Sequence, residues 1–295
     1  MERKFIASVF DHAAARDNLT KDDFQITYRG KNLTPRTASY GRGPRRLMVL
    51  LDVSGSMQTT QGNATKWQVA RLAAWDLLAA LPSGSKVGLI TFSATVQTQV
   101  PLSTSRDEVT KWLNSEKARR VELLKGRTAL FDALESALEQ LHPSVPGDAI
   151  YVITDGGENA SQIRQSKVQK AFRDSGIRLF TLMLPADRYT PPLEFADRET
   201  LANLSTESGG VVEWLDAEHG ARMFDEQLKK RLVTHAARLS SQISGFYTLT
   251  VDLPENPEKA KRWEVAILES GKRKKDARIS YPRDVPPCQM HGSGK

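Results

Sequence analysis

Two kinds of hydrophobic patterning divide the chain into a central part and two flanks. In the central part, continuous apolar runs alternate with stretches whose apolar residues recur at the spacing of amphipathic helices. We expect strands at residues 47–51, 87–92, 96–102, 149–154, 177–184 and 211–212, and helices at residues 70–81, 130–141, 161–174 and 217–239. Continuous apolar runs are typical of parallel strands buried on both faces. The alternation therefore predicts an α/β domain with a doubly wound, mostly parallel sheet.

Both flanks instead show the two-residue alternation of antiparallel strands. We expect these strands at residues 5–10 and 24–28 in the first flank and at residues 247–253, 263–267 and 277–281 in the second. Neither set of strands is large enough to be stable on its own, because isolated hairpins are only marginally stable in water. We predict one small β module built from both termini, with strand pairing between residues 1–35 and 245–281. The predicted division is 1–44 and 244–284 for the module, 45–243 for the α/β domain inserted in it, and 285–295 for a tail.

Composition excludes several classes of protein. The chain has 295 residues, of which 39% are hydrophobic and 26% charged, which is not the composition of a disordered chain. No stretch approaches the ~20 apolar residues that a membrane-spanning helix needs. The single cysteine, Cys288, excludes an internal disulfide framework, and the five histidines are scattered without ligand spacing, so we do not expect zinc chemistry.

The net charge of +7 is concentrated in the flanks. Residues 29–46 contain six basic residues and no acidic one, and residues 258–278 contain eight basic residues against four acidic ones. This pattern indicates either a solvated strand surface or a surface for an anionic partner such as a cell-wall polymer. Aromatic residues do not interleave with the basic ones, so we expect no specific nucleic-acid partner.

Short polar motifs follow two of the expected buried strands. Asp52, Ser54 and Ser56 follow the first strand of the central part, and Asp155 follows the fourth. Thr128 stands just before a predicted helix. In an open α/β sheet, ligands bind at the carboxyl ends of the strands, where these residues should meet. Each motif alone is also typical of a helix cap or a turn, but together they form the all-oxygen set that hard divalent cations such as Mg²⁺ prefer.

The order of these residues resembles the metal-ion-dependent adhesion site of the von Willebrand factor type A (VWA) domain, which reads D-x-S-x-S, then a Thr, then an Asp at a strand end. The resemblance covers approximately residues 45–240 and implies a Rossmann-like sheet. The segments Leu19–Phe24 and Gly245–Leu249 are similar to those that flank the domain in a bacterial VWFA-related (Acidobacteria-type) family.

The resemblance implies which residues bind a metal and what the metal does. Ser54 and Ser56 would bind Mg²⁺, or Mn²⁺ or Ca²⁺, directly through their hydroxyls, Thr128 directly or through water, and Asp52 and Asp155 mostly through water. A free coordination position would accept an Asp or Glu carboxylate of a partner protein. The expectation is a protein-binding or adhesion module that is not an enzyme.

Two other functions stay open. A carboxylate beside Mg²⁺ can be a nucleophile, so Asp52 could serve a metal-dependent hydrolase or phosphatase, although the chain lacks the G-x-S-x-G and phosphate-loop motifs. The protein could also be a scaffold that binds anionic partners through its basic flanks. The sequence does not define the oligomeric state.

Three further expectations concern single residues and the compartment. A rim at Met57, Gln58 and Asn159 would set partner specificity, and Trp75 would pack beside Ala74 and Leu78. The family resemblance favours an extracytoplasmic or secreted protein. The first residues do not form a signal peptide, so a cytoplasmic location is the alternative.

Overall fold

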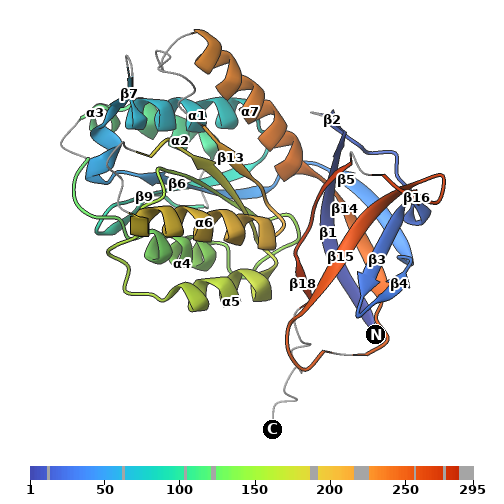
Figure 1. Ribbon diagram of the computed structural model, residues 1–295. Helices are drawn as coiled ribbons and strands as arrows, with labels where there is room; N and C mark the ends of the chain where they lie inside the picture. The colour runs from blue at the N-terminus through green and yellow to red at the C-terminus, as the bar shows by residue number, and fades with distance from the viewer. Residues whose placement is uncertain are drawn as a thin grey trace.

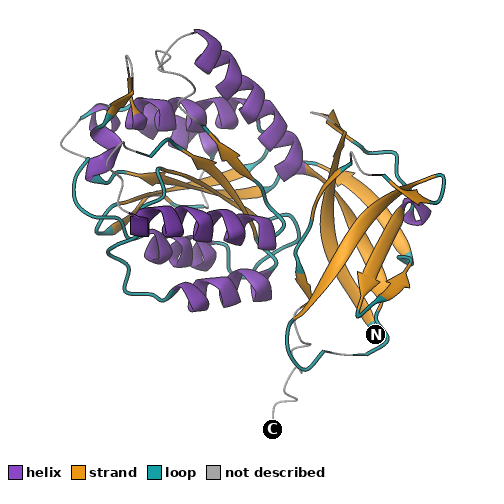
Figure 2. Ribbon diagram, in the orientation of Figure 1, coloured by secondary structure: helices purple, strands orange, loops and turns teal. Residues whose placement is uncertain are grey.

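The computed structural model describes residues 1–11, 14–61, 64–102, 105–120, 124–186, 192–215, 226–255, 257–274 and 277–285. A layered part, in which helices cover both faces of a central sheet, lies beside a second part built of strands (Figures 1 and 2). The expected tail beyond residue 285, with Cys288, lies outside the described residues.

The central sheet has the strand order β10–β9–β6–β11–β12–β13. Its strands are β6 (Arg46–Asp52), β9 (Lys86–Phe92), β10 (Val96–Val100), β11 (Ala149–Thr154), β12 (Arg178–Met183) and β13 (Val212–Trp214). All of them pair in parallel except β10, which runs antiparallel to β9 at the edge. The doubly wound, mostly parallel sheet is therefore confirmed.

Helices pack on both faces of this sheet and bury the inner strands β6, β9, β11 and β12 almost completely, whereas the edge strands β10 and β13 keep exposed positions. One face is covered by α1 (Lys66–Ala80), α2 (Arg106–Asn114), α3 (Glu116–Arg119) and α7 (Glu226–Ser244). The other face is covered by α4 (Leu130–Gln140), α5 (Gln165–Ser175) and α6 (Pro192–Glu207). None of the helices in the described residues is long and apolar enough to cross a membrane.

Some helical details differ from expectation. The helix expected from residue 161 begins at Gln165, because the Ser161 hydroxyl accepts hydrogen bonds from the Phe131 and Asp132 amides and so caps α4 instead. The long helix runs to Ser244 rather than to residue 239, and residues 216–225 at its expected start lie outside the described residues. Trp75 does not pack in the core as expected: it is 42% exposed.

The β module consists of two sheets that share one apolar core. The first contains β17 (Arg278–Ser280), β1 (Glu2–Asp11), β14 (Gly245–Asp252) and β5 (Thr37–Arg42), with β2 (Ala14–Ala15) beside β1. The second contains β16 (Lys272–Arg273), β15 (Lys261–Glu269), β3 (Phe24–Tyr28) and β4 (Lys31–Leu33), with β18 (Asp284–Val285) beside β15. Strand β1 pairs with β14, and β3 pairs with β15. The predicted pairing between the two ends of the chain is confirmed, whereas the proposed domain boundaries stay a prediction.

A fully buried arginine joins the two parts. Arg178, at the start of β12, donates hydrogen bonds to the backbone oxygens of Gln242 (2.8 Å) and Ile243 (2.9 Å) at the end of α7. A weaker contact of 3.4 Å reaches the hydroxyl of Ser8 in β1. Burial, and then the charge of Arg45, lower the pKa of Arg178 to about 9. One side chain thus bonds to the central sheet's last helix and to the first strand of the β module.

Candidate metal centre

The sheet topology places the two candidate carboxylates at one edge. Strands β6 and β11 are neighbours and parallel, with Leu51 opposite Ile153. Asp52 is the residue after Leu51, and Asp155 stands two residues after Ile153, so both lie at the carboxyl edge of the sheet. The two are close enough that the charge of Asp155 contributes to a raised pKa of Asp52.

The loop after β6 turns its serines toward one another. The Ser54 amide donates to Asp52 Oδ1 (2.8 Å), and the hydroxyl oxygens of Ser54 and Ser56 lie 3.1 Å apart. The short 3-10 helix η2 (Gly55–Gln58) follows, and then a small hairpin of β7 (Thr60–Gln61) and β8 (Ala64–Thr65) leads into α1. Three of the five candidate ligands, Asp52, Ser54 and Ser56, are therefore linked by hydrogen bonds within this loop.

Thr128 approaches the same edge from a second loop. Its amide donates to Asn159 Oδ1 (2.8 Å), and its carbonyl accepts from the Asn159 amide (2.9 Å), so the Thr128 segment is tied to the loop after β11. The Gly55 amide donates to the carbonyl of Gly126 (3.1 Å), which ties it to the serine loop as well. The Thr128 hydroxyl itself forms no hydrogen bond to the other four candidates among the described residues. The structure therefore brings the Thr128 segment to the site, but not its hydroxyl into contact with the other candidates.

Asp52 is a buried carboxylate with polar partners but no cation. It is 0% exposed, and its Oδ2 accepts a hydrogen bond from the Thr154 hydroxyl (2.6 Å). Burial, and then the nearby charge of Asp155, raise the pKa of Asp52 to about 7 from an ordinary 3.8. No Lys, Arg or His pairs with it in the part of the chain that the structure describes. A buried carboxylate of this kind is strongly stabilised by a bound cation.

Asp155, in contrast, has a cationic partner that the sequence analysis missed. The Lys66 ammonium, on the first residue of α1, lies 2.7 Å from Asp155 Oδ2, and the Lys66 side chain is 0% exposed. Arg198 of α6 also holds this segment, because it donates to the Asp155 carbonyl and to that of Leu184. A signal for Lys66 existed: it stands four residues before Ala70, at a position on the apolar face of α1.

The predicted specificity rim is only partly correct. Met57 is 0% exposed and fills the core under the loop, so the expectation that it lines the rim is wrong. The reason is the turn of η2, which points this side chain inward. Gln58 and Asn159 are exposed at this edge, although Asn159 also holds Thr128.

The donor set fits a hard divalent cation. Asp52, Ser54 and Ser56 lie together, Asp155 lies near Asp52, and the Thr128 segment is bonded to the same loops. The described ranges contain no group of three or more His, Cys, Asp or Glu side chains that could hold a metal, at this edge or elsewhere, so hydroxyls would have to complete the set here. Neutral hydroxyls beside a buried, unpaired carboxylate are suitable for Mg²⁺, Mn²⁺ or Ca²⁺, which take oxygen ligands. The ligand assignment for all five residues is a proposal.

The fold and this edge define a doubly wound α/β protein with an oxygen-rich loop site. Residues 47–158 match the family model of the von Willebrand factor type A domain. The chain therefore contains a VWA domain. A search of curated protein sequences finds no match.

Solved structures show the same fold. An aerotolerance-related membrane protein from Bacteroides fragilis has 22% identity and a TM-score of 0.52, with 68% of this chain and 98% of that chain covered. Proximal thread matrix protein 1 from the mussel byssus, with zinc in its MIDAS motif, has 15% identity and a TM-score of 0.50, with 72% of this chain and 49% of that chain covered. At such identities the likeness concerns the fold alone.

Proposed function

We propose that this protein is a metal-dependent protein-interaction module. A divalent cation, Mg²⁺ or else Mn²⁺ or Ca²⁺, would be held by Asp52, Ser54, Ser56, Thr128 and Asp155. The observation that carries the proposal is the fully buried Asp52 carboxylate, which has no cationic partner in the described residues and lies beside two hydroxyls 3.1 Å apart. A neighbour in fold carries zinc in its MIDAS motif, which supports the same kind of site here.

The bound cation would supply an electrophilic position for a carboxylate of the partner, an Asp or Glu side chain. The protein's own residues would prepare that position. Asp52 is held on both oxygens by the Ser54 amide and the Thr154 hydroxyl, so it contributes charge without moving. Ser56 and Asp155 are partly exposed, which leaves the outer side of the site accessible to a partner. Gln58 and Asn159 would then contact the partner around it.

Thermal unfolding of metal-stripped protein, with and without added MgCl₂ or MnCl₂, tests the metal site. A ligand that binds only the native state stabilises it by RT ln(1 + [L]/Kd), about 2.7 kcal/mol at a hundredfold excess over Kd. Ser54→Ala and Asp155→Ala should remove most of this stabilisation. Ser85→Ala is the matched control, since Ser85 is a buried serine at the opposite end of the sheet that bonds the Pro82 carbonyl. Equal metal effects in all four proteins would contradict the site.

A partner-binding measurement tests the mechanism. Binding of any isolated partner should disappear in the presence of a chelator and in Ser54→Ala, and it should also disappear when one acidic residue of the partner is changed to Asn or Gln. A partner whose affinity survives both the chelator and Ser54→Ala would show that binding occurs on another surface.

The alternative of a metal-dependent hydrolase has less support. Its nucleophile would be Asp52, which is 0% exposed and already accepts a hydrogen bond on each oxygen. A substrate phosphoryl group cannot approach such a carboxylate in line. Hydrolysis of p-nitrophenyl phosphate that requires Mg²⁺ and is lost in Asp52→Asn would favour the enzyme over the binding module.

The basic flanks also offer less free charge than the sequence indicates. Arg29 pairs with Glu255, Arg273 with Glu264, and Arg36 lies 3.6 Å from Asp252. These pairs lie within the β module, so part of its basic charge is balanced there. We therefore favour the carboxyl edge of the VWA sheet over the flanks as the surface for the protein partner.

We also propose an extracytoplasmic or secreted location. The proposal rests on the resemblance of the flanks to a bacterial family and on the neighbour in fold that is described as a membrane protein. Cell fractionation of the tagged full-length protein tests it, and recovery in the cytoplasmic fraction alone would contradict it.

A further inference from the structure

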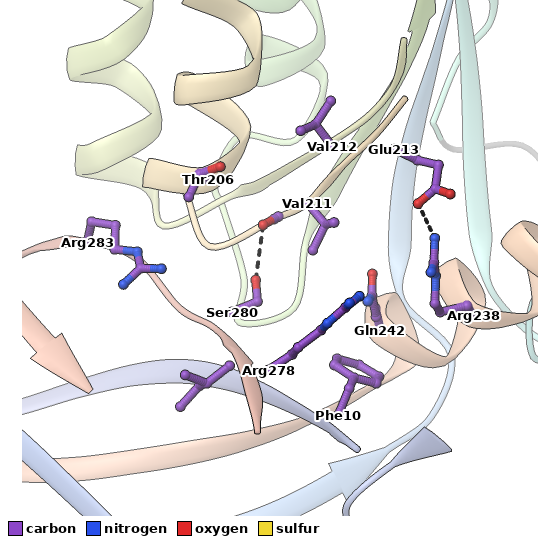
Figure 3. A pocket seen from close by; sticks show the side chains of 12 residues that line it. Phe10, Thr206, Val211, Val212, Glu213, Arg238, Gln242, Arg278, Ser280 and Arg283 are labelled. Atoms are coloured by element: carbon purple, nitrogen blue, oxygen red, sulfur yellow. Dashed lines mark hydrogen bonds and ion pairs between the residues drawn. The ribbon is translucent and has the colours of Figure 1, made fainter. Parts of the chain in front are cut away.

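A cavity of about 290 Å³ lies where the VWA domain meets the β module. Its walls come from β13 and α7 on one side and from β17 and the segment after it on the other (Figure 3). Strand β13 is the edge of the central sheet, and β17 is an edge of the first sheet of the β module. The cavity is remote from the candidate metal centre in the fold, because it includes Gly210 and Val211 at the start of β13, opposite the carboxyl edge.

The lining of this cavity is strongly basic. Three arginines contribute to it, Arg238, Arg278 and Arg283, against a single acidic residue, Glu213. Glu213 is already ion-paired with Arg238. Arg283 donates to the neutral hydroxyl of Tyr281 and stacks on its ring. Two guanidinium charges are therefore left without an acidic partner among the described residues.

Two polar side chains in the cavity have no partner in the described part of the chain. Arg278 makes no hydrogen bond and no ion pair there, and Figure 3 shows it extended across the cavity toward Gln242. Gln242 is only 7% exposed, yet its side-chain amide has no hydrogen-bond partner in the same residues. Arg278 is exposed, so its guanidinium is solvated by water and available to an entering anion. Gln242 is largely buried, and a buried amide normally finds hydrogen-bond partners.

We propose that this cavity binds a small oxyanion, a carboxylate or a phosphate group. The Arg278 guanidinium would bind two of its oxygens, the geometry that guanidinium groups favour with such anions. Arg283 would add a second positive charge, and the Gln242 amide would donate from α7. The volume is at the lower limit of small-molecule pockets and admits a small metabolite-sized anion.

The bound anion would contact both parts of the protein. Arg278 and Arg283 belong to the β module, whereas Gln242 belongs to the last helix of the VWA domain. Binding would therefore stabilise the junction that Arg178 already bonds through the Gln242 carbonyl. This role is independent of the metal centre.

Isothermal titration calorimetry of the full chain with inorganic phosphate and, separately, with malonate tests the proposal. Metal is first removed from the protein on a chelating resin, so that malonate cannot bind to a metal ion in the metal centre. Ionic strength is held constant with NaCl. We expect saturable binding of one anion per chain. Binding of phosphate alone, of malonate alone or of both shows which oxyanion the cavity prefers. Arg278→Gln should weaken binding at least about tenfold.

Two further variants separate a built site from general attraction to a basic protein. Gln242→Met keeps the charge and removes the amide, so binding should weaken several-fold. Arg42→Gln removes an exposed arginine from β5, the opposite edge strand of the same sheet, and should leave the affinity unchanged. Absence of saturable binding for both anions, or equal weakening by Arg278→Gln and Arg42→Gln, would overturn the proposal.

Discussion

Replacement of Lys66 by Met should destabilise the metal-free protein and at the same time increase its affinity for the metal. The Lys66 side chain is 0% exposed and that of Asp155 is 9% exposed, with 2.7 Å between Nζ and Oδ2. Breaking a buried ion pair by removing one partner costs about 3–5 kcal/mol, because the other charge stays buried. We expect Lys66→Met to lose about this much unfolding free energy in the absence of metal.

The gain in metal affinity follows from the same charges. With Lys66 present, the two carboxylates of the proposed site carry one compensating positive charge, so a divalent cation meets a net charge of −1 rather than −2. In Lys66→Met the cation alone neutralises Asp155. If metal binding recovers half of the lost 3–5 kcal/mol, its affinity rises at least about tenfold, since tenfold corresponds to 1.4 kcal/mol.

Calorimetric titration with MgCl₂ or MnCl₂ measures the affinity, and denaturant unfolding with and without metal measures the stability. Arg46→Met is the matched control: it breaks the Arg46–Asp148 pair, in which Asp148 is 1% exposed, at the opposite end of β6. This control should lose stability and keep its metal affinity. Weaker metal binding in Lys66→Met would refute the reasoning, because Lys66 would then help to hold Asp155 for the metal rather than compete with it.

Three other predictions concern stability. Burial, and then the charge of Arg238, lower the pKa of His235 to about 4, so the contribution of this side chain to unfolding free energy should fall by roughly 2–3 kcal/mol between pH 6.5 and 4. The raised pKa of Asp52 acts in the opposite direction over this range, so the contribution is read as the difference between the protein and His235→Gln in urea unfolding, which should shrink as pH falls. Arg178→Met leaves the carbonyls at the end of α7 without their donors and should lower the unfolding free energy by about 3 kcal/mol in the same assay. An unchanged unfolding midpoint would show that the cost of burying the Arg178 charge is as large as the stabilisation from its hydrogen bonds. Gly210→Ala would place Cβ 1.8 Å from the Leu179 carbonyl oxygen and should lower Tm severely, whereas Gly43→Ala, with open space around it, should not.

The periodic parts of the fold could be predicted from the sequence because burial determines them. A run such as Leu47–Leu51 is apolar at every position only when both faces of its strand are covered, as they are in β6. The edge strand β5 and the helix α6 do not stand out in the sequence, since their apolar residues are few and their burial depends on partners far along the chain. Strand β5, for example, is placed by its pairing with β14.

The candidate site likewise contains residues that the sequence identifies and residues that it does not. Residues that carry the motif, such as Asp52 and Ser54, stand next to each other in the chain and can be recognised there. Lys66 and Arg198 cannot, because their roles arise only when α1 and α6 pack near the end of β11. A lysine on the apolar face of a helix nevertheless indicates a buried anion opposite, and such positions can be sought in the sequences of other chains of this fold.

Assembly of the β module from both chain ends has a consequence for the order of folding. Its first strand, β1, meets β14 although Ser8 and Gly245 are 237 residues apart. Within the fold, however, the Gly43 amide lies 3.1 Å from the Ser244 carbonyl, so the inserted domain holds its own two ends together. Once that domain has folded, the loop to be closed shrinks from about 240 flexible residues to about 36, which lowers the entropic barrier by about 1.7 kcal/mol. During synthesis β1 emerges early, yet apart from the short β2 it has no partner until β14 has been made. We therefore expect the VWA domain to form first and to serve as the clamp on which the two ends assemble last.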